Sequence, residues 1–244
     1  MESNRTRTSP LPIQDSPFAT SGNRSFLSRL ADDRSALIQL SIAVVVLVLG
    51  IGAIALIYNS RANSSAEQLS SALQTFAAPI RSSENPLPSS VRSFGSEQER
   101  AKAANAEFTA IADKYGMMPA GRNAQYLAGI TSLQLGQNSA AEARLKKGAD
   151  SWNNDIANLS RLALANLYST TGRQSDAIAE YKKSIDHPSN LVPSGLARLQ
   201  LADMYASNGN AAEAKKIYAE IKDKDPKSAA AELANEKLNG PAAR

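Results

Sequence analysis

The hydrophobic pattern of this chain begins with a long uncharged stretch. No charged residue occurs from Ser35 to Ser60, and every position from Ile42 to Ile57 is apolar or glycine. As a helix, the 22 residues from Leu37 to Tyr58 would extend about 33 Å, enough to cross a hydrocarbon core of about 30 Å. We therefore predict a membrane-spanning helix over residues 36–60.

Two other interpretations of this stretch are weaker. A buried helix of a soluble domain would need long apolar segments around it, and the rest of the chain has none. A cleaved signal peptide would suit the small residues Ala53 and Ala55, but such peptides have a short basic lead and an apolar core of about 7–15 residues. Here the core is longer and 34 residues precede it, which favours an uncleaved anchor.

Basic residues on the two sides of the span predict its orientation. Arg24, Arg29 and Arg34 precede the span, whereas Arg61 alone follows it closely. An excess of Lys and Arg marks the cytoplasmic flank of a membrane helix. We expect a single-pass protein with a cytoplasmic N-terminus, which in a bacterium would place the remaining chain on the periplasmic side of the inner membrane. The absence of cysteine from the sequence is compatible with that compartment.

Two segments lack a hydrophobic period. Residues 1–35 are rich in Ser, Thr, Arg and Pro, which predicts a disordered cytoplasmic tail. Residues 81–95 contain two prolines and several serines, which is typical of a linker.

The spanning helix is predicted to continue as an amphipathic helix over residues 61–80 until Pro79 stops it. The apolar positions at helical spacing are Leu69, Leu73, Phe76 and Ile80. This apolar stripe needs a partner, and we considered the first repeat, the membrane surface and a neighbouring chain. Packing on the repeats is the simplest choice, and self-association through Leu69, Leu73 and Phe76 is the alternative.

Three stretches of the second half of the chain repeat one another, at spacings of 36 and then 37 residues. The period is that of a two-helix repeat, in which small residues allow close helix approach and a glycine ends the first helix in the left-handed conformation. The matching positions are Gly129, Ala165 and Ala202; Ser132, Tyr168 and Tyr205; Gly136, Gly172 and Gly209; Ala141, Ala177 and Ala214; and Leu145, Tyr181 and Tyr218.

Two details follow from this register. The second helix of each unit should begin near Ser139 or Ser175, which are good N-cap residues, whereas the third unit has Ala212 there and would lose that bond. Tyr168 and Tyr205 should both pack between helices of neighbouring repeats.

The repeated positions resemble the tetratricopeptide repeat family over residues 97 to 227. The first unit departs from the family pattern at Ser132 and Leu145, where aromatic residues are usual, and all three units lack the early tryptophan. The resemblance implies an all-α protein, in which the single N-terminal transmembrane helix is followed by an α-solenoid of tetratricopeptide-like helix pairs. The best match is Ala202, Tyr205, Gly209, Ala214, Tyr218 and Pro226.

Elements at both ends complete the predicted repeat domain, which we place at residues 96–240. Ala104, Phe108 and Ile111 lie 37 residues before the matching positions of the first full unit and so form half of a further repeat. At the other end, residues 227–238 predict a final helix that caps the solenoid, since a terminal repeat would otherwise leave its apolar face in water.

Charge and chemistry exclude several function classes. Residues 62–244 contain 21 basic and 19 acidic side chains without a basic stripe, so we expect no nucleic acid partner. The sequence has no cysteine, and its single histidine, His187, lies beside Pro188 in a predicted turn. With no phosphate-binding loop either, we predict no catalytic residue, no metal site and no cofactor.

Binding of other proteins is the remaining function. The family resemblance implies a groove lined by the first helix of each repeat, although some of its leucines could equally belong to the core. The set lacks the Lys, Arg and Asn cluster that clamps a carboxylate terminus in some family members. The corresponding positions are Asn123, Tyr126, Ile130, Leu133 and Gln134; Leu159, Leu162, Asn166, Ser169 and Thr170; and Leu196, Leu199, Asp203, Ala206 and Ser207.

The order of elements is similar to the membrane-anchored ancillary subunit of bacterial Sec translocons. That resemblance implies a periplasmic scaffold held to the inner membrane by residues 36–60, with translocon subunits, periplasmic chaperones or exported proteins as partners. A cell-envelope assembly or cell-division factor, a secreted repeat protein and a self-associating module are the alternatives, because the fold alone does not fix the partner.

Overall fold

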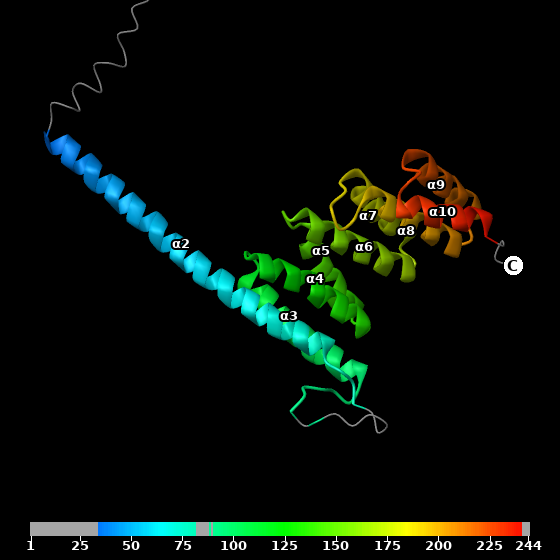
Figure 1. The fold of residues 1–244 in the computed structure, drawn as a ribbon, viewed down its shortest axis with the longest axis horizontal. Coiled ribbons are helices and arrows are strands. Elements are labelled where there is room, and N and C mark those ends of the chain that lie inside the picture. Colours follow the sequence, from blue (N-terminus) through cyan, green and yellow to red (C-terminus); the bar gives the residue numbers. More distant parts are fainter. Residues whose placement is uncertain (1–33, 82–87, 89, 241–244) are drawn as a thin grey trace, which may run out of the picture. The chain divides into compact units, whose positions relative to one another are not determined.

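The computed structural model describes residues 34–81, 88 and 90–240 (Figure 1). The predicted tail at residues 1–35 therefore lies almost wholly outside the described residues, as does much of the predicted linker. The described residues form nine helices and no β-strand, so the all-α prediction is confirmed for this part of the chain. The helices are α2 (Arg34–Ala77), α3 (Glu97–Tyr115), α4 (Pro119–Gln134), α5 (Asn138–Ala149), α6 (Asn154–Thr170), α7 (Gln174–Asp186), α8 (Ser194–Ser207), α9 (Ala211–Lys224) and α10 (Ala229–Asn239).

Two compact units divide the chain at Ile57 and Tyr58. The described part of the first unit is the apolar portion of α2, whose large hydrophobic side chains are exposed. Among the described residues α2 is the one helix long and apolar enough to cross a membrane, with a mean hydropathy of 2.7 and no buried residue in its most apolar window. A signal sequence would meet the same criterion of length and hydropathy.

The second unit begins with the C-terminal part of α2, which packs on α3. Leu69 and Ala72 are buried in one cluster with Phe108, and the ring of Phe76 meets that of Phe108 edge-on at a centroid distance of 6.0 Å. Leu73 is exposed. Most of the apolar stripe of α2 is thus buried against α3 of the same chain. The C-terminal part of α2 is the helix that pairs with α3 in the half repeat.

Two polar contacts fix the register of α2 on α3. The Gln68 amide donates a hydrogen bond to the Tyr115 hydroxyl at 2.8 Å, and the Thr75 hydroxyl donates one to Glu107 at 2.8 Å. Helix α2 ends at Ala77, three residues before the predicted boundary at Ile80. The early end has a steric reason, because Pro79 disfavours the helical conformation of the residue before it.

Helices α4 to α9 form three antiparallel pairs, α4 with α5, α6 with α7 and α8 with α9, and α10 packs on α9 and α8 (Figure 1). Between the helices of each pair the predicted glycine has a positive φ, 69° at Gly136 and 80° at Gly172 and Gly209. The backbone closes each turn, as where Arg173 N–H donates to Tyr168 C=O at 2.7 Å. This is the bonding of a glycine-terminated helix.

The predicted serine caps are wrong. Helices α5 and α7 begin at Asn138 and Gln174, so Ser139 and Ser175 lie inside the first turn, and no side chain caps either helix. The glycine turn is so short that its backbone bonds lead directly from one helix into the next. The third unit was expected to lack a cap because it has Ala212 at this position, but α9 has the same uncapped start as α5 and α7.

Small residues set the distance between the helices of each pair. A methyl group at Gly129 would come within 2.6 Å of the Leu145 side chain, and Ala165 and Ala202 are fully buried at the matching positions. Tyr168 is buried as predicted, whereas Tyr205 is only partly buried at the edge of the core. The array explains this difference, because a single helix, α10, follows the last pair and gives less cover than a complete repeat would.

A charged network links two neighbouring repeats. Glu142 on α5 is ion-paired with Lys146 at 2.8 Å and with Arg173 at 2.9 Å, and it accepts a hydrogen bond from the Tyr168 hydroxyl at 3.1 Å. The hydrogen bond from Lys146, followed by those from Arg173 and Tyr168, lowers the pKa of Glu142 from 4.5 to about 2. Folding therefore favours the ionised carboxylate.

Replacement of Glu142 should make stability less dependent on pH. The network stabilises the folded state above pH 4.5, where the carboxylate is ionised whether the chain is folded or not, and this contribution is lost as pH falls towards about 2. We expect Glu142→Gln to lower the free energy of unfolding by about 1 kcal/mol at pH 7. Thermal unfolding followed by circular dichroism should show parent and variant converging near pH 2, and a constant difference from pH 7 to pH 2 would contradict the assignment.

Truncation of Phe108 tests whether α2 belongs to the repeat array. Phe108 of α3 is fully buried in one cluster with residues of α2, so Phe108→Ala should lower the free energy of unfolding by about 3–5 kcal/mol. Met117→Ala is the control, because Met117 is 83% exposed and should change stability by less than about 0.5 kcal/mol. Urea unfolding of the full chain in detergent measures both, and a loss below about 1 kcal/mol for Phe108→Ala would show that this contact is not part of the folded core.

Candidate protein-binding groove

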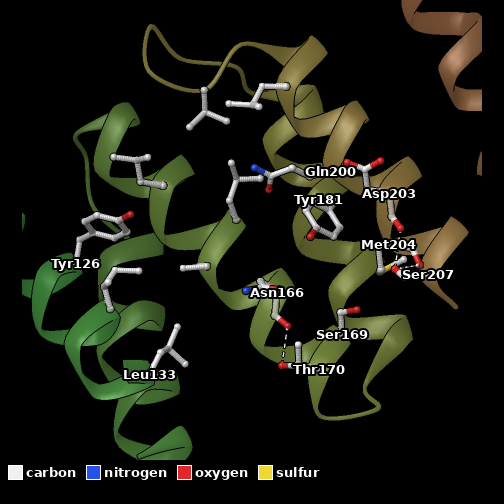
Figure 2. Close-up of a pocket in the computed structure, with 16 residues that line it drawn as sticks. Tyr126, Leu133, Asn166, Ser169, Thr170, Tyr181, Gln200, Asp203, Met204 and Ser207 are labelled. Carbon is white, nitrogen blue, oxygen red and sulfur yellow. Dashed lines mark hydrogen bonds between the residues drawn. The ribbon is translucent and has the colours of Figure 1, made fainter. Parts of the chain in front are cut away.

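A cavity lies along the first helices of the three full repeats (Figure 2). Its volume is about 630 Å³. Helices α4, α6 and α8 supply most of its lining, and Tyr181 from α7 and Val192 from the α7–α8 connection also line it. The repeat geometry explains this arrangement, because the same helix of each unit returns to the same face every 36 or 37 residues.

The two sides of the groove differ in polarity. Helix α4 presents Tyr126, Ile130 and Leu133, which are largely apolar. Helix α8, on the other side in Figure 2, presents Gln200, Asp203 and Ser207. Helix α6 lies between them and contributes both kinds of side chain, among them Leu159, Leu162, Asn166 and Thr170. A ligand in this groove would meet apolar surface at one edge and hydrogen-bonding groups at the other.

Asp203 is the one charged residue among those that line the groove in the described part of the chain. It accepts a hydrogen bond from the Tyr218 hydroxyl, and Lys237 of α10 lies 3.3 Å from its carboxylate. Burial, followed by the hydrogen bond to Asp203, raises the pKa of Tyr218. Burial together with the Asp203 charge also raises the pKa of Tyr181, to about 12. The raised pKa values keep both phenols protonated into the alkaline range, and the Tyr218 hydroxyl donates its proton to the Asp203 hydrogen bond.

Most residues predicted for the groove do line this cavity. The structure brings together Tyr126, Ile130, Leu133, Leu159, Leu162, Asn166, Ser169, Thr170, Leu196, Asp203 and Ser207. Four predicted residues lie elsewhere. Asn123 borders a separate hollow beside Asn153, Leu199 is buried against α9 and α10, and Gln134 and Ala206 are exposed outside the cavity.

The cavity also contains residues that the repeat register did not indicate. Ala163, Gln200 and Met204 lie on the predicted helices, one position from residues that were named, and helical periodicity alone could have placed them. Tyr181 and Val192 gave no such signal, because Tyr181 lies on α7, the second helix of its repeat, and Val192 lies in a connection for which no role was predicted. The leucines do not divide cleanly between core and groove. Leu162, for example, is 8% exposed and belongs to the hydrophobic core, and it also lines the cavity.

The described residues contain no group of three or more His, Cys, Asp or Glu side chains placed to hold a metal ion. The groove offers shape, apolar area and hydrogen bonds, which are properties of a binding surface.

Stacked antiparallel helix pairs with a groove along their first helices define a helical repeat protein of the protein-binding class. The chain belongs to the tetratricopeptide repeat-like domain family, whose family model matches residues 37–240. Comparison with curated proteins and with solved structures gives no significant match to this chain. The matched range includes the apolar part of α2 as well as the repeats.

Membership of this family supports protein partners in general. Its repeat fold is typically a scaffold for protein–protein interaction and not an enzyme.

Proposed function

We propose that this protein is a membrane-anchored periplasmic scaffold, which binds a segment of another protein in the groove between α4, α6 and α8. The observation that carries the proposal is the groove itself, which is repeat-built, about 630 Å³ in volume and lined by both apolar and polar side chains. We further propose that it acts beside the secretion translocon and links exported chains or periplasmic chaperones to it.

The groove chemistry indicates what kind of segment it takes. Tyr126, Ile130 and Leu133 favour apolar side chains along α4, whereas Asn166 and Gln200 can hydrogen-bond a peptide backbone. Asp203 is already bonded to Tyr218 and paired with Lys237, so it adds a carboxylate hydrogen-bond acceptor to the α8 edge and little free charge. The lining residues include no Lys or Arg in the described part of the chain, so the groove does not suit a carboxylate terminus.

The anchoring proposal rests on α2. Its apolar portion is exposed along its length, and in water such a helix would leave a large hydrophobic surface uncovered. The same helix continues to Ala77, and its C-terminal part packs on α3. We place its N-terminus in the cytoplasm because Arg24, Arg29 and Arg34 precede it.

Site-specific photo-crosslinking in living cells tests the groove. A benzophenone amino acid at Asn166, which is exposed in the groove, should crosslink to translocon subunits or periplasmic chaperones. The same amino acid at Lys182 is the matched control, since Lys182 is exposed on α7 outside the groove. Equal products from both positions would show that the groove is not the binding site. Products limited to envelope-assembly or division proteins would keep the groove but replace the translocon as its partner.

Cysteine labelling tests the topology, because the natural sequence contains no cysteine. Lys182→Cys should react with a membrane-impermeant maleimide in spheroplasts, whereas Thr8→Cys should react only after the membrane is opened. The reverse pattern would contradict the periplasmic placement of the repeats. Loss of the Thr8→Cys label from the mature chain, seen as a shorter product, would indicate a cleaved signal sequence instead of an anchor.

A further inference from the structure

A second cavity lies away from the groove and shares no lining residue with it. It has a volume of about 410 Å³ and lies between the end of α3, the start of α4 and the connection from α5 to α6. Its most unusual member is Arg122 on α4, which is 7% exposed. A buried guanidinium is rare, because removing its charge from water is costly unless the charge is paired.

Arg122 has little compensation for that burial. Its Nη1 donates a hydrogen bond to the Met117 carbonyl at 2.9 Å, but its Nε is buried and has no partner among the described residues. No carboxylate within the described part of the chain forms an ion pair with it. Burial lowers the pKa of this arginine, although a guanidinium remains charged at any physiological pH. The structure thus holds a buried positive charge without its counterion.

Trp152 covers this charge. The guanidinium carbon of Arg122 lies 3.7 Å from the centre of the Trp152 ring, in a cation–π contact. Trp152 is itself 77% exposed, and the neighbouring Met117 is 83% exposed. Large exposed side chains of these types beside a cavity are typical of protein-binding surfaces, where Trp and Arg contribute much of the binding energy.

The remaining charges around the cavity determine what would neutralise it. Asp113 is already paired with Arg144. The other charged residues that line the cavity are Arg122, Lys147 and Asp150, and their charges sum to one positive charge. A single carboxylate matches both this excess and the planar fork of a guanidinium, whereas a phosphate would bring more negative charge close to Asp113 and Asp150.

We propose that the cavity at Arg122 and Trp152 is a second protein-binding site, which takes a carboxylate of a partner protein. The carboxylate pairs with Arg122 and Lys147, and an apolar side chain beside it packs on Trp152 and Met117. The site could serve a C-terminal carboxylate or an acidic side chain, since the chemistry is shared. It does not depend on the groove, and the two sites could hold different partners or two parts of one partner.

Trp152 is the single tryptophan of the sequence, so its fluorescence reports on this site alone. The full chain in detergent is titrated with three peptides: N-acetyl-Ala-Ala-Leu with a free C-terminus, N-acetyl-Ala-Glu-Leu-amide and the uncharged N-acetyl-Ala-Ala-Leu-amide. We expect a saturable change in emission with at least one of the two charged peptides and none with the uncharged one. Comparison of the charged pair shows which source of carboxylate the site takes. An equal response to the uncharged peptide would overturn the proposal.

Arg122→Gln should weaken binding of the responding peptide at least tenfold. Arg173→Gln is the matched control, because Arg173 also stacks on an aromatic ring, that of Tyr168 at 4.0 Å, but is paired with Glu142 and Asp176. The control should retain the affinity of the parent. Unchanged affinity in a folded Arg122→Gln variant, judged by circular dichroism, would overturn the proposal.

Two further measurements keep the test decisive. If Arg122→Gln does not fold, Lys147→Gln replaces it, because Lys147 is exposed on α5 and its loss should weaken binding several-fold without affecting the fold. Unchanged affinity in that variant would count against the site. Titration with inorganic phosphate tests the ligand class, and saturation by phosphate at lower concentration than by either charged peptide would show that the site is not specific for carboxylates.

Discussion

The packing of Phe76, Leu69 and Ala72 on Phe108 is the contact on which the repeat array depends at its N-terminal end. A helix pair cannot bury its apolar face alone, so each repeat needs a neighbour on both sides. At the N-terminal end the last turns of α2 pair with α3 before the first full repeat, and at the C-terminal end the single helix α10 follows the third. The helix that completes the array is therefore the same helix that contains the apolar span.

The C-terminal part of α2 is held to α3 by polar contacts as well as by apolar packing. The linker predicted at residues 81–95 follows the end of α2 and connects it to α3. The hydrogen bonds of Gln68 to Tyr115 and of Thr75 to Glu107 hold the first repeat to the helix itself.

The two binding surfaces proposed for the repeats differ in their physical basis. The groove along α4, α6 and α8 follows from the repeat geometry and combines apolar area with hydrogen-bonding groups, so it suits an extended stretch of a partner. The cavity at Arg122 and Trp152 lies at one connection between repeats and is defined by a buried charge. A partner that used both would gain affinity from two contacts held at a fixed separation.

The amino-acid sequence by itself determined the helical repeats, the uncharged span and the position of the turns. These features follow from local rules, since glycine alone readily accepts the positive φ at Gly136, Gly172 and Gly209, and small residues must recur where helices approach. Only the tertiary structure decided that the stripe of α2 belongs to the first repeat, that Tyr181 and Val192 reach the groove and that Leu199 does not. It also brought Arg122 and Trp152 together across thirty positions of the chain. Such contacts depend on which helix faces which, and that is set by long-range packing that periodicity within one helix does not encode.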